Sequence, residues 1–244
     1  MILAAGLGTR LRPLTDRLPK PLLPLAGRPL IEYTLAWIAS AGITQVMINL
    51  HYKGDLIREA LGDGRRFGLD LSYSEEPDIL GTGGGLKHVE GFLGDGPFLV
   101  VNADILTGLD PRELIAAHAR NRGLVTLAVR RAPDAASYGV LGLDDEGRIR
   151  RFLGRGPWQG PALHEVMFTG IHVVEPRVLA EIPPGVFAPI TDAYIAMVER
   201  GERVFGHPTD ASWIDIGTPD RYREAQRLVA DGLIAPPAFA RGAC

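Results

Sequence analysis

Short apolar segments alternate with helical ones through the first half of the chain, and this alternation limits the fold more than any other feature. Buried-strand patterns occur at 2–5, 46–50, 69–73 and 98–102, and apolar residues recur at helical spacing between them, as in 30–41. Strands that alternate with helices over short connections pack as a parallel sheet covered by helices. We therefore predict an α/β fold with a Rossmann-like, mixed but mostly parallel central sheet flanked by helices.

The pattern changes after residue 130. Two strand patterns at 138–143 and 148–153, joined by the turn at 144–147, predict an antiparallel hairpin. We assign this hairpin to a small antiparallel subdomain. The predicted organisation is one domain over 1–231, with halves 1–130 and 131–210, a closing segment 211–231 and a flexible tail 232–244.

A glycine-rich turn follows the first predicted strand, in the segment from Gly6 to Arg10. Two glycines allow the backbone to turn sharply, and the consecutive N–H groups of such a turn form a concavity that suits an anion. Lys20 stands between Pro19 and Pro21, and these prolines reduce the entropy lost when the lysine is held in place. The glycine turn, Arg10 and Lys20 together predict a polyphosphate site.

Two common phosphate-binding motifs do not fit this turn. A dinucleotide fingerprint requires a third glycine where the chain has Leu11, and an acidic residue where it has Asn49 to His51. A Walker loop requires a Gly-Lys pair, which the chain lacks. A reductase-like nucleotide-binding module remains a rival interpretation, and binding of NAD(P)H would distinguish it.

Two later segments also carry candidate ligand-binding residues. The segment from Gly81 to Gly85 contains four glycines and precedes a predicted helix at 86–93, so it predicts close approach of the backbone to a ligand. Asp104 follows a buried strand at its carboxyl end, where ligands bind in open α/β sheets. A carboxylate there suits Mg²⁺, although it could also serve as a turn residue.

Charge and cysteine content favour a cytoplasmic protein. The formal net charge is −3, so no overall field attracts nucleic acid or anionic lipid. The one cysteine, Cys244, excludes an internal disulfide. No apolar run approaches the roughly 18 residues of a membrane span. We expect no nucleic-acid partner and no membrane partner.

Three segments resemble the signature motifs of the sugar-1-phosphate nucleotidyltransferases. The segment from Leu3 to Leu11 resembles L-A-A-G-x-G-T-R-L, that from Pro19 to Pro24 resembles P-K-P-L-x-P, and that from Trp213 to Pro219 resembles W-x-D-[IV]-G-T-P. The resemblance covers about residues 1–230. It implies an Mg²⁺-dependent, in-line reaction of a nucleoside triphosphate with a sugar 1-phosphate, which yields a nucleotide sugar and pyrophosphate. A monomer or homodimer is expected.

The resemblance also implies roles for individual residues. Asp104 and Asp215 correspond to the family's metal ligands, although the usual Gly-Asp pair is Ala103-Asp104 here. Arg10 and Lys20 are the implied catalytic residues. The implied nucleotide contacts are Leu3, Ala4, Ala5, Gly6, Gly8, Thr9, Arg10, Lys20, Gly81, Thr82, Gly83, Gly84 and Asn102. The implied sugar-phosphate contacts are Asp104, Tyr138, Gly139, Arg155, Gly170 and His172.

The substrates are less constrained than the reaction. Many relatives carry Glu-Lys-Pro after the hairpin, where this chain has the segment 154–157; Arg155 there either replaces the lysine or is a solvated loop residue. The missing motif and the segment from Thr82 to Gly85 favour UTP with an amino-sugar 1-phosphate of the N-acetylmuramate type. GTP with mannose or heptose 1-phosphate is the alternative. A non-catalytic, nucleotide-sugar-binding regulatory subunit is the alternative of another class.

Overall fold

The computed structural model describes residues 1–131, 138–235 and 239, so most of the predicted tail at 232–244 lies outside the described residues. The chain divides into two compact units. Unit 1 consists of Met1–Ile79, Val101–Pro111 and Ala211–Cys244, and unit 2 of Leu80–Val100 and Arg112–Asp210. Each unit is therefore assembled from segments that are distant in sequence.

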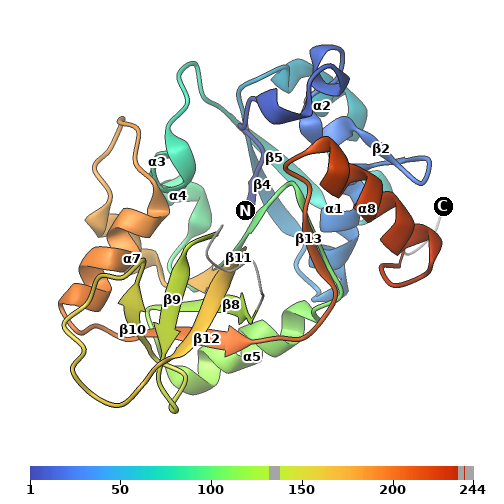
Figure 1. Cartoon of the computed structure of the whole chain (residues 1–244). Coiled ribbons are helices and arrows are strands. Elements are labelled where there is room, and N and C mark those ends of the chain that lie inside the picture. The colour runs from blue at the N-terminus through green and yellow to red at the C-terminus, as the bar shows by residue number, and fades with distance from the viewer. Residues whose placement is uncertain (132–137, 236–238, 240–244) are drawn as a thin grey trace. The chain divides into compact units, whose positions relative to one another are not determined.

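Parallel strands form the centre of unit 1. Strand β1 (Ile2–Leu3) lies between β4 (Gln45–Leu50) and the last residues of β6 (Phe98–Asn102), and β5 (Asp70–Glu75) pairs with the other edge of β4 (Figure 1). From its second residue onward, β4 is buried, as expected for a strand covered on both faces. The predicted parallel α/β organisation is confirmed. Strand β1 is two residues shorter than predicted because the backbone leaves the ladder after Leu3.

Helix α1 (Leu30–Ser40) agrees with the helical spacing predicted at 30–41 to within one residue. The other α-helices described for unit 1 are α2 (Gly54–Leu61) and α8 (Pro219–Ala230). Helix α8 buries Tyr222 and Ala225 on the face that packs into the core of unit 1. The shorter 3-10 helices of this unit are η1 (Thr9–Leu11), η2 (Leu14–Asp16), η3 (Lys20–Leu22) and η4 (Arg65–Phe67).

Two small antiparallel sheets in unit 1 were not predicted. The first pairs β2 (Pro24–Leu25) with β3 (Arg28–Pro29). The second pairs β7 (Ile105–Thr107) with β13 (Trp213–Asp215), so that Asp215 lies opposite Ile105. Strands of two or three residues carry too little periodicity to be recognised from sequence, and their pairing depends on long-range contacts.

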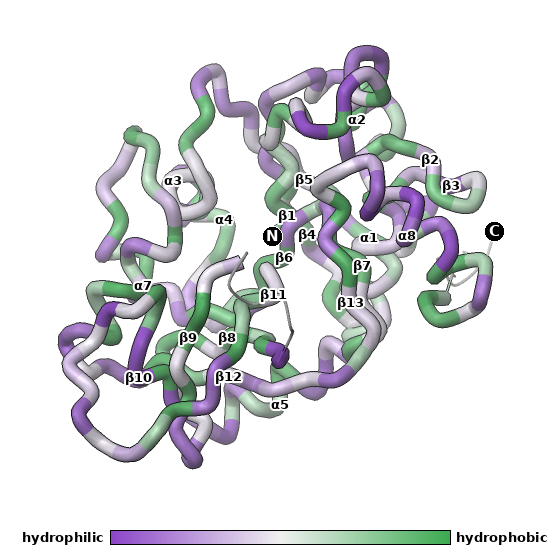
Figure 2. The backbone as a smooth tube through the Cα atoms, viewed as in Figure 1, coloured by the Kyte–Doolittle hydropathy of each residue, from purple (hydrophilic) through white to green (hydrophobic). Residues whose placement is uncertain are grey.

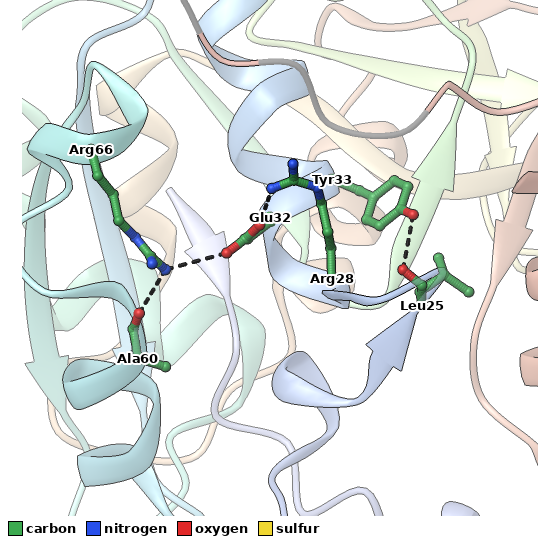
Figure 3. Close-up of polar contacts among 6 residues, drawn as sticks. All are labelled: Leu25, Arg28, Glu32, Tyr33, Ala60 and Arg66. Carbon is green, nitrogen blue, oxygen red and sulfur yellow. Dashed lines mark hydrogen bonds and ion pairs between the residues drawn. The ribbon is translucent and has the colours of Figure 1, made fainter. Parts of the chain in front are cut away.

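A buried carboxylate ties the β2–β3 hairpin to the remainder of unit 1. Glu32 on α1 is only 5% exposed, and it pairs with Arg28 at 3.4 Å and Arg66 at 3.2 Å (Figure 3). The hydroxyl of the neighbouring Tyr33 donates to the carbonyl of Leu25 at 3.0 Å. This hairpin follows the segment that carries Lys20, so Glu32 stabilises the chain next to that lysine.

Unit 2 contains a largely antiparallel sheet. Strand β9 (Val140–Leu143) pairs with β10 (Ile149–Phe152) and β11 (His164–Val174), which confirms the predicted hairpin. Strand β11 also pairs with β8 (Val125–Arg130), and β8 pairs in parallel with β12 (Val204–Pro208). Hydrophobic residues predominate along β8 and β9 (Figure 2), as expected for strands with neighbours on both sides.

The helices that belong wholly or mainly to unit 2 are α3 (Gly81–His88), α4 (Glu90–Leu93), α5 (Pro111–Asn121), α7 (Ile190–Glu199) and the 3-10 helix η5 (Pro176–Glu181). One boundary differs from prediction: the glycines at 81–85 lie inside α3, although the sequence suggested a loop that ends at Gly85. Among the described residues, no helix combines the length and apolarity needed to cross a bilayer.

Candidate active site

The glycine turn of unit 1 uses its two glycines differently. Gly8 has φ +64°, and a Cβ there would lie 3.1 Å from Thr15 Cγ2 and 3.3 Å from Lys20 Cβ. Gly6 has no such constraint, and a Cβ there would have no neighbouring atom within 4 Å. Gly8 is therefore required for the turn and for its packing against Lys20, whereas Gly6 leaves the exposed backbone open to a ligand.

The segment after the glycine turn is held by side chains from within unit 1. Thr15, which is 1% exposed, donates its hydroxyl to the carbonyl of Gly8 at 2.9 Å. The hydroxyl of Tyr52 donates to the carbonyl of Thr15 at 3.1 Å, and Lys53 Nζ donates to the carbonyl of Asp16. The turn between β4 and α2 thus supports the loop that carries Arg10.

Lys20 and Asp104 form an ion pair. Lys20 begins the 3-10 helix η3, between Pro19 and Pro21, and its Nζ donates to Asp104 Oδ2. The two side chains are only 13% and 23% exposed. The pair is therefore partly shielded from water, where an electrostatic interaction is stronger than at the surface.

The β7–β13 sheet brings the two candidate metal ligands together. Asp104 precedes β7 and Asp215 ends β13, and the N–H of Ile216 donates to the carbonyl of Asp104 at 2.9 Å. A Cβ on Gly217 would lie 2.7 Å from Asp215 Oδ1 and 3.2 Å from an Arg10 guanidinium nitrogen. The Arg10 guanidinium and the Asp215 carboxylate therefore both lie next to Gly217.

Burial and like charge raise the pKa of Asp215. Burial raises this pKa most, and the charge of Asp104 raises it further, while Lys20, Arg10 and Arg221 lower it. Asp104 and three cationic side chains therefore lie within electrostatic reach of Asp215. The contribution of Asp104 also shows that the two carboxylates are held together at an energetic cost, which a bound cation would relieve.

The two carboxylates fit a magnesium ion. Asp104 Oδ1 is buried and has no hydrogen-bond partner among the described residues, so it is available as a ligand. Mg²⁺ prefers oxygen ligands and usually retains several waters, so that one or two carboxylates together with substrate phosphates suffice. In the described part of the chain, no group of three or more His, Cys, Asp or Glu residues could hold a metal ion.

In unit 2, the glycine-rich segment of helix α3 is contacted closely by the backbone at 186–190. The N–H groups of Gly83 and Gly84 donate to the carbonyl of Ala188 at 2.8 and 3.0 Å. Thr82 Oγ1 accepts from the N–H of Ile190 at 2.9 Å. A Cβ on Gly83 would lie 2.9 Å from the Ala188 oxygen. The close approach predicted for these glycines is therefore made by the segment 186–190, and a nucleotide contact here stays a prediction.

Two glycines predicted near the sugar phosphate have positive φ angles in unit 2. Gly139 has φ +88°, and a Cβ there would lie 2.2 Å from Leu153 Cδ2. Gly170 has φ +80° and lies where the β11–β8 register is irregular. Tyr138, which precedes Gly139, is half-buried. A positive φ angle accounts for both glycines, and close packing against Leu153 adds a further reason at Gly139. Their contact with a sugar phosphate stays a prediction.

Two charged or titratable candidates of unit 2 have surroundings that the sequence did not suggest. Arg155 donates to both carboxylate oxygens of Glu199 on α7, at 2.9 and 3.1 Å, so its guanidinium is engaged in an exposed ion pair. His172 is 1% exposed, and its two ring nitrogens have no hydrogen-bond partner among the described residues. Burial lowers the pKa of His172 to about 3, so the ring is neutral. Contact of either side chain with a sugar phosphate stays a prediction.

Sequence reasoning missed several residues of the unit 1 site. Arg221 lies in the first turn of α8, after the N-cap Thr218, and its charge lowers the pKa of Asp215. A cation in the first helical turn opposes the helix dipole, which is a signal that could have drawn attention to it. Thr15 and Asn49 were also missed, because their role depends on hydrogen bonds to distant backbone groups.

Comparison with known proteins identifies the family of this chain. The family model described as "Nucleotidyl transferase" matches residues 1–232. The chain is 37% identical to the N-acetylmuramate alpha-1-phosphate uridylyltransferase of Neisseria meningitidis, with 93% of this chain and 96% of that protein covered. It is 35% identical to the mannose-1-phosphate guanylyltransferase of Mycobacterium tuberculosis, with 98% and 66% covered.

A solved structure shares the fold. The HddC protein of Yersinia pseudotuberculosis superposes with a TM-score of 0.75 at 23% identity, and the match covers 93% of this chain and 96% of that one. The chain belongs to the nucleotidyl transferase family. The chain spans just under two thirds of the length of the guanylyltransferase relative.

Proposed function

We propose that this chain transfers a nucleotidyl group from a nucleoside triphosphate to a sugar 1-phosphate and releases pyrophosphate. The observation that carries the proposal is the convergence of Lys20, Asp104, Asp215 and Arg10 in unit 1. Family membership supports the same reaction class, since the relatives named above are guanylyl and uridylyl transferases of sugar 1-phosphates.

The proposed reaction requires no general base. A sugar phosphate is already an anion at neutral pH, and one of its oxygens attacks the α-phosphorus in line. The bond from the α-phosphorus to the oxygen that bridges to the β-phosphorus breaks, and pyrophosphate leaves with the electron pair. Catalysis of such a transfer consists of positioning and charge neutralisation.

Each candidate residue has a defined part in this proposal. Lys20 neutralises the transferred phosphoryl group, and it shifts from Asp104 toward the phosphate when substrate binds. Arg10 and the open backbone at Gly6 hold the leaving pyrophosphate, where fixed donors stabilise developing charge. Asp104 and Asp215 would hold Mg²⁺, which supplies further positive charge to the phosphate oxygens.

We propose UTP and an amino-sugar 1-phosphate of the N-acetylmuramate type as the substrates. The supporting observation is the extent of the match, because the uridylyltransferase relative is covered over 96% of its length and the guanylyltransferase relative over 66%. The guanylyl match favours a second candidate, GTP with mannose 1-phosphate.

A substrate matrix tests both levels of the proposal. Pyrophosphate release is measured with Mg²⁺ for ATP, CTP, GTP, UTP and dTTP against N-acetylmuramate, N-acetylglucosamine, glucose, mannose and heptose 1-phosphates. We expect the strongest signal with UTP and N-acetylmuramate 1-phosphate. A strong signal with a different pair would identify that pair as the substrates and would still support the proposed reaction. A blank matrix from folded protein that binds a nucleotide would count against all of the tested substrate pairs and favour either a regulatory subunit or a sugar outside the matrix.

A further inference from the structure

The side chain of Asn49 accepts a backbone hydrogen bond at the point where the chain leaves β1. Leu3 lies opposite Asn49 in the β1–β4 register, and the next N–H, that of Ala4, donates to the Oδ1 atom of Asn49 at 2.7 Å. Asn49 is 3% exposed, so this contact is protected from water. The Asn49 side chain thus holds the first residue of the segment that leads into the glycine turn.

A buried carboxylate orients the Asn49 amide. Asn49 Nδ2 donates to Glu76 Oε1 at 2.7 Å, and Glu76 is 2% exposed. A backbone N–H can only donate, so the amide oxygen of Asn49 must face Ala4 and the NH₂ group faces Glu76. The opposite orientation would place two acceptors against each other and leave the Ala4 N–H facing a donor.

Glu76 itself is held by two backbone contacts at the end of β4. Its N–H donates to the carbonyl of Leu50 at 2.8 Å, and its carbonyl lies 2.7 Å from His51 Nδ1. A carbonyl can only accept, so His51 carries a proton on Nδ1. Burying a carboxylate costs free energy unless it is hydrogen-bonded. The hydrogen bond from Asn49 reduces that cost, and the same bond orients the Asn49 amide.

We propose that Asn49 and Glu76 are positioning residues for the nucleoside triphosphate, acting through the backbone at Ala4. By fixing where the chain leaves β1, they fix the direction in which the Gly6 to Thr9 backbone meets the polyphosphate. This inference rests on one part of the proposed function, namely that the glycine turn binds a nucleotide. Neither side chain touches the substrate.

An exchange of donor and acceptor tests the inference. Asn49→Asp places a second carboxylate against Glu76, and we expect it to raise the Kd for UTP and GTP about tenfold or more, the size of one charged hydrogen bond. In the double variant Asn49→Asp/Glu76→Gln, the carboxylate at position 49 accepts from the Ala4 N–H and from the side-chain NH₂ group at position 76, so both hydrogen bonds are restored. Its Kd is expected to return to within about threefold of wild type. Glu76→Gln alone retains an acceptor and is expected to have a small effect.

A matched control separates positioning from stability. Thr126→Val removes a buried hydroxyl that lies 3.0 Å from His118 Nδ1 in unit 2, far along the chain from the glycine turn. It should lower Tm without changing nucleotide Kd. If Asn49→Asp fails to fold, Asn49→Ala removes both hydrogen bonds without adding a charge. In turnover assays the Asn49 variants should raise the KM for the nucleotide and leave that for the sugar phosphate unchanged.

The two proposals fail in different ways. Nucleotide Kd is measured without a sugar phosphate, so an inactive protein whose Kd responds as expected would refute the reaction and support the positioning role. An active protein whose Kd is unchanged in the Asn49 variants, or is not restored in the double variant, would overturn the positioning role. A wild-type protein that binds no nucleoside triphosphate would overturn both.

Discussion

Substitution of Gly84 in α3 distinguishes packing from ligand contact as the reason for the glycine-rich segment. A Cβ on Gly84 would lie 2.6 Å from the backbone oxygen of Val186 and 3.0 Å from Leu80 Cβ. Backbone cannot move aside as a flexible side chain would, so Gly84→Ala forces the segment at 186–190 away from the helix. Overpacking of this kind costs about 1–3 kcal/mol.

Helix propensity offsets part of that cost. Alanine is favoured over glycine inside a helix by about 0.5–1 kcal/mol, so the expected net loss of stability for Gly84→Ala is about 1 kcal/mol, within a range of about 0–2.5 kcal/mol. For a chain of this size a loss of about 1 kcal/mol corresponds to a decrease in Tm of about 2–4 °C. Gly91→Ala in α4 is the matched control, because a Cβ there has no neighbour within 4 Å. That variant should be neutral or slightly stabilising.

Thermal unfolding followed by circular dichroism, together with nucleotide Kd for the same samples, provides the assay. The packing interpretation requires a lower Tm for Gly84→Ala than for Gly91→Ala. A Gly84→Ala protein with wild-type Tm and a nucleotide affinity reduced tenfold or more would refute it. That result would instead favour the predicted contact of the segment at 81–84 with the nucleotide.

Three further perturbations test other parts of the structure. His172 has a folded pKa of about 3 against an unfolded value near 6.5, so its stabilising contribution is fully present above pH 6.5 and is lost as pH falls toward 3, by up to about 1.4 kcal/mol per pH unit. His172→Phe should therefore reduce the loss of unfolding free energy between pH 6.5 and pH 3, measured by denaturant titration. An unchanged loss over that pH range would contradict the assigned burial. Lys20→Ala should lower kcat about 10²-fold or more in protein that circular dichroism shows to be folded, and near-wild-type turnover would remove Lys20 from the mechanism. Glu32→Gln should cost about 1 kcal/mol, discounted because both arginine partners are half exposed, and added salt should shrink the difference from wild type.

Local patterns in the sequence determined the class of fold and the main motifs. Apolar runs and helical spacing predicted β4 and α1 to within one residue, because each depends on a periodicity contained in its own segment. The need for glycine at position 8 was equally local, since a positive φ angle is a property of one residue. Signature motifs further predicted Lys20 and Asp215 as members of one site, and unit 1 brings them within electrostatic reach.

Only the tertiary structure decided which distant groups meet. Asp104 and Asp215 come together through the short β7–β13 sheet, whose strands are too brief to show a period. The sequence did not predict a role for Glu76, because its contact is the side-chain amide of Asn49, more than twenty positions away in sequence. The sequence suggested that His172 serves a sugar site, whereas packing places it in a core without hydrogen-bond partners among the described residues. Periodicity specifies which faces are buried but not which partner covers them, and the chemistry of each polar side chain is set by that partner.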